Sequence, residues 1–140
     1  MSTEQNKSIV RRWVEEGWNK GNLAVIDQLY APNYVEHGIQ PETVNSSEAL
    51  KQEVRMFLTG VPDLHISIDD LIAEGDKVVW RGIWKGTQTG PFMGIPATGK
   101  TATMTAIVIF RLENSRIVEG WVNIDLLGLM QQLGVIPMPG

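Results

Sequence analysis

The stretch that decides the fold lies near the C-terminus and reads Ile117-Val118-Glu119-Gly120-Trp121-Val122-Asn123-Ile124-Asp125-Leu126-Leu127-Gly128-Leu129-Met130-Gln131-Gln132-Leu133-Gly134. The residues up to Asp125 have the pattern of a strand, and the apolar spacing after it predicts a helix over residues 126–133. From Trp121 to Met130 only Asn123 and Asp125 carry polar side chains. Asp125 therefore stands in apolar surroundings, where a strand passes into a helix.

Two roles are open for this aspartate. As the residue before a helix, Asp125 could cap it by accepting from the free N–H groups of the first turn. As a carboxylate with little water around it, Asp125 would hold a proton more readily, and could exchange that proton with a substrate near neutral pH. The two roles can coexist, so the face of the strand on which Asp125 lies becomes important.

Side chains alternate between the two faces of a strand, which puts Glu119, Trp121, Asn123 and Asp125 on one face. A face that mixes a large aromatic ring with polar groups is typical of a pocket wall, so we expect this face to line a pocket. The other face is apolar and carries Val118, Gly120, Val122 and Ile124. It would serve as plain apolar cover, or as a surface buried against a second subunit.

Strand signals fill the rest of the second half of the chain. Residues 64–69 alternate apolar and polar, 78–85 form a second strand, and 101–112 are rich in Thr, Ile and Val. Asp69-Asp70 breaks the alternation of the first of these strands, which indicates a bulge. Because the turns at 74–76 and 113–115 are short, we expect antiparallel pairing of the strands that they join.

Helical signals dominate the first 60 residues. Ser2 and Gln5 can form a capping box for a helix that runs to Gly17, and a second helix follows over residues 22–30. Residues 34–37 are extended, 38–46 have the composition of a loop, and a third helix includes Leu50 to Leu58. Helices followed by a meander of strands predict an α+β fold. A long curved sheet with helices across one face would enclose a conical cavity.

Size and composition limit the possible functions. The 140 residues fit one domain spanning 1–140, and a net charge of −4 argues against nucleic acid as a partner. No stretch is apolar enough for a membrane span, and the N-terminus lacks the apolar core of a signal peptide, so we expect no membrane partner and a cytoplasmic location. The chain has no cysteine, and its His, Asp and Glu residues lack metal-ligand spacing, so we expect no metal site.

Three further motifs point to a family. They are Tyr34-Val35-Glu36-His37, Pro62-Asp63-Leu64-His65 and the glycine-rich segment Gly86-Thr87-Gln88-Thr89-Gly90-Pro91-Phe92-Met93-Gly94-Ile95-Pro96-Ala97-Thr98-Gly99-Lys100. Together with Glu119-Gly120-Trp121 and the segment from Asp125 to Gly134, they resemble the SnoaL-like polyketide cyclase (ester cyclase) family over almost the whole chain. The resemblance implies the nuclear transport factor 2-like fold, a cone-shaped roll in which a curved mixed or antiparallel sheet and N-terminal helices enclose a pocket.

The resemblance also implies an activity, which is a cofactor-free intramolecular aldol closure with Asp125 as general acid/base. The chain departs from the family at Gln88, where relatives often carry a histidine. A glutamine can hydrogen-bond a substrate carbonyl, but it cannot exchange a proton at neutral pH.

We expect two catalytic residues, Asp125 as the base and His37 on the cavity wall, although His37 could equally be a structural or surface histidine. We expect Arg81 to pair with Glu119, leaving Asp125 free. The alternatives are a pair with Asp125, which would lower the pKa of that aspartate, and a surface position for Arg81. The loop from Gly86 to Gly99 would act as a lid over the cavity mouth. The candidate substrate-binding residues, whose aromatic members could instead be ordinary core, are Trp13, Trp18, Trp80, Arg81, Gln88, Phe92, Met104, Glu119 and Trp121.

The leading functional hypothesis is therefore a cofactor-independent acid/base enzyme of polyketide-cyclase type, acting on a small apolar carbonyl compound. One alternative is epoxide hydrolysis, with Arg81 and Asp125 as part of a water-activating set. Another is a small-molecule binding protein without turnover. Because a curved sheet leaves an apolar outer face, we also expect a homodimer.

Overall fold

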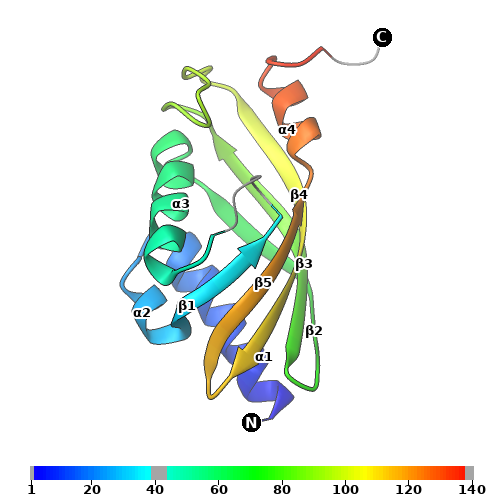
Figure 1. Ribbon diagram of the computed structural model, residues 1–140. Helices are drawn as coiled ribbons and strands as arrows, with labels where there is room; N and C mark the ends of the chain where they lie inside the picture. The colour runs from blue at the N-terminus through cyan, green and yellow to red at the C-terminus, as the bar shows by residue number, and fades with distance from the viewer. Residues whose placement is uncertain (1, 39–43, 138–140) are drawn as a thin grey trace.

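The computed structural model describes residues 2–38 and 44–137, in which helices pack against one face of a curved sheet (Figure 1). The sheet has the strand order β1-β5-β4-β3-β2. Strand β1 pairs in parallel with β5, and the other neighbours pair antiparallel. The strands are β1 (Tyr30–His37), β2 (His65–Glu74), β3 (Lys77–Thr87), β4 (Thr101–Glu113) and β5 (Arg116–Ile124). The predicted α+β fold with a mixed sheet is confirmed.

The helices begin and end close to the predicted signals. They are α1 (Thr3–Arg12), the π-helical turn η1 (Trp13–Trp18), α2 (Val25–Leu29), α3 (Ser47–Gly60) and α4 (Leu126–Gln132). Ser2 and Gln5 form the predicted capping box of α1, and Ser46 caps α3. The first helix differs from the prediction because it widens into a π-helical turn before Gly17. A side chain at Gly17 would overlap the ring of Trp13, so the glycine lets this ring lie flat on the turn.

The sheet register matches the predicted meander. The pairing of β2 with β3 shifts between Ile68 and Asp70, which is the bulge expected at Asp69-Asp70. Strand β1 is longer than the predicted extended segment and begins at Tyr30. Of the loop predicted for residues 38–46, the part from 39 to 43 lies outside the described residues.

The inner face of the sheet carries the core, and here one prediction is wrong. On β5 the buried residues are Ile117, Gly120 and Val122, whereas Asn123 is exposed and Trp121 is half-buried. The apolar face of this strand therefore packs on the helices, and the mixed face points to the outer side of the sheet. Gly120 is part of the inner layer because a side chain there would overlap the hydroxyl of Tyr34.

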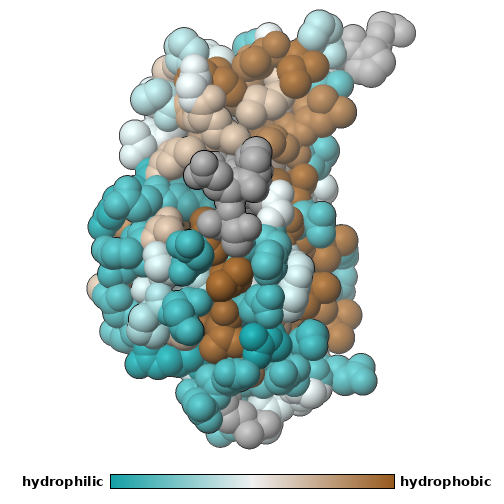
Figure 2. Space-filling view, in the orientation of Figure 1, coloured by the Kyte–Doolittle hydropathy of each residue, from teal (hydrophilic) through white to brown (hydrophobic). Residues whose placement is uncertain are grey.

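Helix α4 lies apart from the other helices, beyond the end of β5 and beside the first part of β4 (Figure 1). No residue from Leu126 to Gln132 is buried. The surface over this end of the molecule is strongly hydrophobic, as is the edge formed by the sheet (Figure 2). Within the described ranges, no helix has the length and apolar character needed to cross a bilayer.

Candidate functional site

Two small cavities lie between the sheet and the helices, and they share one wall, the side chain of Trp84. The outer cavity holds about 30 Å³ and opens between α4 and the loop that joins β3 to β4. The inner chamber holds about 20 Å³ and is walled by Trp13, Trp18, Trp80 and Trp84. By volume, the inner chamber has room for a single water-sized group.

Two glutamates, Glu36 and Glu53, line the inner chamber. On β1 the alternation that turns Tyr34 inward also turns Glu36 inward. On α3 Glu53 lies one turn from both Leu50 and Phe57, on the face that packs against the core. Glu36 is 7% exposed and Glu53 is 9% exposed, so both carboxyl groups are buried among aromatic rings.

The two carboxyl groups interact directly. Burial, together with a hydrogen bond to Glu36 and the charge of Glu36, raises the pKa of Glu53 from 4.5 to about 9. Like charges this close in a dry site cannot both ionise, so the pair holds a proton at neutral pH. The hydroxyl of Tyr34 donates to Glu36 Oε1 at 3.0 Å, and burial raises the pKa of Tyr34 well above its usual value. The chamber therefore contains a carboxyl pair that can both accept and donate a proton.

Two of the tryptophans that line this chamber have an indole N–H without an acceptor. Among the described residues, three buried side-chain polar atoms have no hydrogen-bond partner, and two of them are the indole nitrogens of Trp80 and Trp84. Trp80 is 1% exposed and Trp84 is 4% exposed. Trp84 packs against Trp18, with ring centroids 4.7 Å apart, and against Phe57 at 5.2 Å.

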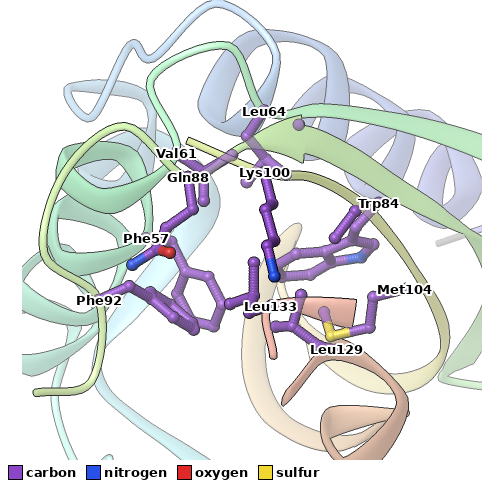
Figure 3. Close-up of a pocket in the computed structure, with 12 residues that line it drawn as sticks. Phe57, Val61, Leu64, Trp84, Gln88, Phe92, Lys100, Met104, Leu129 and Leu133 are labelled. Atoms are coloured by element: carbon purple, nitrogen blue, oxygen red, sulfur yellow. The ribbon is translucent and has the colours of Figure 1, made fainter. Parts of the chain in front are cut away.

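The outer cavity is apolar and lies between the body of the fold, the loop that joins β3 to β4, and the C-terminal segment. Its lining includes Phe57 and Met104 from the body of the fold, Phe92 from the loop, and Leu129 and Leu133 from the C-terminal segment (Figure 3). Phe92 and Met104 thus both line this cavity, and whether the loop that carries Phe92 acts as a lid stays a prediction.

Gln88 lines this cavity but has no free polar atom to offer a ligand. Its Nε2 donates to the carbonyl oxygens of Gly90, Ile95 and Pro96, at 3.1 to 3.2 Å. Its Oε1 accepts from the backbone N–H and the hydroxyl of Thr98. We had expected Gln88 to bind a substrate. Its buried amide instead holds the loop in shape.

Asp125 lies outside both cavities, and the expectation that it faces a dry pocket is wrong. Its side chain is exposed and caps α4 by accepting from the backbone N–H of Gly128 at 2.9 Å. The physical reason is the register of β5, in which the buried face carries Gly120 and Val122. The capping role that the sequence left open is confirmed.

Four other candidates lie on the outer face of the sheet. His37 Nε2 lies 2.9 Å from Glu119 Oε2, and the ring of His37 stacks on Trp121 with centroids 5.7 Å apart. The hydrogen bond from His37, helped by Arg111, lowers the pKa of Glu119. Arg81 is paired with Asp70 at 2.7 Å and not with Glu119, so the expected Arg81–Glu119 pair is wrong. These residues therefore lie on the opposite side of the sheet from both cavities.

Comparison with known proteins fixes the family. The family model for SnoaL-like polyketide cyclases matches residues 8–133. The chain belongs to the SnoaL-like polyketide cyclase family. No curated protein matches it in sequence.

Solved structures of similar proteins agree with this assignment. A candidate SnoaL-like polyketide cyclase from Jannaschia sp. CCS1 is 26% identical with a TM-score of 0.89, covering 96% of this chain and 95% of that one. TsrD from Streptomyces laurentii is 31% identical with a TM-score of 0.88, covering 97% and 99%. Wild-type IdmH, a candidate polyketide cyclase from Streptomyces antibioticus, is 30% identical with a TM-score of 0.81, covering 94% and 99%.

In this SnoaL-like protein the structure brings together only part of the predicted set. Trp13, Trp18 and Trp80 line the inner chamber, and Phe92, Met104 and Gln88 line the outer cavity. Asp125, His37, Arg81, Glu119 and Trp121 do not line either of them. In the part of the chain that is described, no group of three His, Cys, Asp or Glu side chains could hold a metal ion.

The sequence analysis missed the two chamber glutamates. Glu53 carried a signal, because a carboxylate on the apolar stripe of a helix, between Leu50 and Phe57, must be buried if that stripe packs on the core. Glu36 carried a weaker signal, because on a short strand it faces the opposite side from Val35 and His37.

Proposed function

We propose that this protein is a cofactor-independent acid/base enzyme of polyketide-cyclase type, which closes a small, mostly apolar carbonyl compound by an intramolecular aldol reaction. The observation that carries the proposal is the buried Glu36–Glu53 pair inside a tryptophan-walled chamber. Membership of the family supports the reaction type, and the apolar walls support an apolar substrate.

In the proposed reaction the carboxyl pair takes one proton from a substrate carbon and returns one proton to the product oxygen. The Glu36 carboxylate removes a proton from the carbon next to a carbonyl, and the enolate carbon attacks a second carbonyl carbon of the same molecule. A C–C bond forms, and the new alkoxide takes up a proton from Glu53 or Glu36. A base with a proton donor beside it serves both steps, and such positioned proton transfer contributes about 100-fold to 10,000-fold in rate.

Asp125 remains the rival base, because the family resemblance assigns this role to its position. Its exposure and its cap on α4 argue for a structural role. The two proposals make opposite predictions for single variants, so one set of assays separates them.

The test uses a linear diketone whose two carbonyl carbons are separated by three methylene groups. With a methyl group at each end of the diketone, ring closure leaves the mass unchanged and removes the methyl ketone signal from the NMR spectrum, because one methyl becomes a ring CH2 and the other is left on the new carbinol carbon. We expect Glu53→Gln and Glu36→Gln each to lower kcat by about 100-fold or more, and Asp125→Asn to change it little. Glu74→Gln, an exposed glutamate on β2, is the matched control. A wild-type rate in both chamber variants would overturn the proposal, and loss of activity in Asp125→Asn alone would select the rival base.

The alternative reactions have their own readouts. Epoxide hydrolysis is less well supported, because Arg81 pairs with Asp70 and Asp69 on the outer face of the sheet. Solvent oxygen in a diol product would nevertheless select that reaction. Ligand binding without any product from diketones or epoxides would select a binding protein.

We also propose a homodimer formed through the outer face of the sheet. Ile72, Ile83 and Ile107 are 60%, 39% and 48% exposed there, on three adjacent strands. Burying such a patch against a second copy removes apolar area from water. Separately, we propose a cytoplasmic location for the protein.

A further inference from the structure

We propose that the outer cavity is a binding site for an apolar carboxylate. The end of its alkyl chain enters the cavity, and the Lys100 ammonium holds the carboxylate at the rim. The site uses neither the Glu36–Glu53 pair nor the inner chamber, because Trp84 stands between the two cavities. The inference therefore goes beyond the proposed function, and it can fail or succeed independently of it.

The first argument is the composition of the cavity lining. Only Trp84, Gln88 and Lys100 among the lining residues carry a side-chain nitrogen or oxygen. The indole nitrogen of Trp84 is buried, and the amide of Gln88 is fully used by hydrogen bonds within its own loop. The Lys100 ammonium is therefore the one side-chain group of the described lining that can meet a polar part of a ligand. Such a wall fits a ligand that is apolar except at one end.

The second argument is the unpaired charge of Lys100. Within residues 2–38 and 44–137, no Asp or Glu side chain forms an ion pair with this lysine. Asp63 lies beside Gly86 of the lining, but its Oδ1 already accepts from the backbone N–H of Thr87 at 2.7 Å. The positive charge at the rim is therefore available to an anion from outside the protein.

The third argument is the position of the ammonium. Lys100 is the last residue before β4, and its carbonyl oxygen accepts from the backbone N–H of Gln88 at 2.9 Å, which fixes its backbone to the loop. Figure 3 shows its side chain extending toward the other lining residues, with the amine at the tip. A side chain on Gly134 would come within 2.8 Å of Lys100 Nζ, so the glycine leaves room for the ammonium just after α4. The amine thus lies between the loop and the C-terminal segment.

The fourth argument is the size of the cavity and the surface around it. A volume of about 30 Å³ has room for about two water-sized groups, which suits the end of an alkyl chain and excludes a ring. Beyond it, Leu127, Val135 and Ile136 on α4 and the turn that follows are 59%, 48% and 37% exposed. The surface over this end of the molecule is hydrophobic (Figure 2). The rest of a longer chain would lie on this surface, as exposed apolar patches often mark binding sites.

The number of charges selects a carboxylate. Lys100 is the one cationic residue among the described residues of the lining, so it balances a single negative charge. A phosphate group carries up to two charges, and its second charge would have no partner there. An alkylammonium ion would be repelled by Lys100, and an alcohol would leave the ammonium without a counter-charge.

The experiment titrates the protein with hexanoate and with hexan-1-ol, which has the same chain length and no charge. Binding is followed by the ¹³C signal of the Met104 methyl group, which lies in the cavity lining and is assigned with Met104→Leu. Lys100→Met keeps an unbranched apolar side chain and removes the charge, and Lys100→Arg keeps the charge. Lys85→Met, at an exposed position on the outer face of β3, is the matched control.

We expect Lys100→Met to weaken hexanoate binding by about 2-fold to 5-fold, as for the loss of one solvent-accessible ion pair, and to leave hexan-1-ol binding unchanged. Lys100→Arg and Lys85→Met should bind both ligands as the wild type does. The difference between wild type and Lys100→Met should shrink as salt is added, because a charge at the rim is screened. If Lys100→Met fails to fold, Lys100→Gln takes its place.

Three outcomes would overturn the inference. They are a Met104 signal that does not respond to hexanoate, equal weakening of both ligands in Lys100→Met, and a lower urea midpoint of that variant with unchanged hexanoate affinity. The last result would mean that Lys100 only stabilises the C-terminal end of α4, where a cation is favourable. The proposed function fails separately: if Glu53→Gln retains full turnover of the diketone and binds hexanoate normally, the base assignment is wrong and the carboxylate site remains.

Discussion

Tyr34 donates to Glu36 at 3.0 Å in the interior, and the absence of a side chain at Gly120 makes room for the tyrosine hydroxyl. The hydrogen bond lies within β1, and the packing of the tyrosine hydroxyl against Gly120 links β1 to β5. We expect Gly120→Ala to destabilise the fold by about 1–3 kcal/mol, because its methyl group would overlap Tyr34 Oη and press on Phe110. Urea unfolding followed by tryptophan fluorescence measures the change.

The matched background for this variant is Tyr34→Phe, which removes the hydroxyl. In that background Gly120→Ala should cost clearly less than in the wild type, since the main overlap is gone. An equal cost in both backgrounds would show that the tyrosine hydroxyl is not what keeps a glycine at this position.

The stability of the protein should fall as pH rises from about 5 to 9, and Glu53 should be responsible. The folded state raises the pKa of Glu53 from 4.5 to about 9, so it binds this proton more tightly than the unfolded chain does. The resulting stabilisation is complete below the unfolded pKa and is lost as pH approaches the folded one, by at most about 1.4 kcal/mol per pH unit. Glu53→Gln cannot lose a proton, so its stability should change less over this range.

Urea midpoints of wild type, Glu53→Gln and the exposed control Glu74→Gln, taken at several pH values, measure this effect. Parallel curves for all three proteins would mean that Glu53 does not carry the pH dependence.

The order of helices and strands could be predicted because local signals mark their ends. The capping box at Ser2, the prolines after the helices and the turn at residues 113–115 each act through neighbouring backbone groups. The parallel pairing of β1 with β5 could not be predicted in the same way, because it joins residues more than 80 positions apart. No local pattern reports such a contact.

The site was harder to predict because face assignment depends on what lies opposite. On β5 the polar face looked like a pocket wall, yet Arg111 and His37 from the neighbouring strands pair with Glu119 on the outer side. The inward face is filled instead by small and apolar groups that make room for Tyr34. The buried Glu53 was overlooked for the opposite reason, because a single glutamate on a helix is normally solvated.

Gln88 should be essential for the shape of the loop over the outer cavity. Gln88→Leu keeps the volume and removes the five hydrogen bonds that tie the loop to this buried side chain. We expect a loss of at least about 2 kcal/mol and faster hydrogen exchange at Phe92 and Ile95. Thr89→Ala, at the exposed neighbouring position, should leave both unchanged. Protected loop amides in Gln88→Leu would contradict this structural role.

The outer face of the sheet should set the oligomeric state. Ile107 is 48% exposed at the centre of that face, so Ile107→Lys would place a charge in the proposed dimer contact. We expect the wild type to sediment as a dimer and Ile107→Lys as a folded monomer. Leu127→Lys, on α4 and equally exposed to water, is the control that should remain dimeric. A monomeric wild type would rule out this use of the face.

The cap at the start of α4 should require a side-chain oxygen at position 125 but not its charge. Asp125 accepts from Gly128 N at 2.9 Å, and an asparagine can accept in the same way. We expect Asp125→Ala to cost about 0.5–2 kcal/mol and Asp125→Asn much less. Because Leu129 and Leu133 line the outer cavity, Asp125→Ala should also loosen α4 and lower turnover of the diketone, whereas Asp125→Asn should retain it. Helical signals in hydrogen exchange over residues 126–132 measure the cap. If Asp125→Asn keeps α4 protected yet has no turnover, the aspartate has a chemical role beyond the cap.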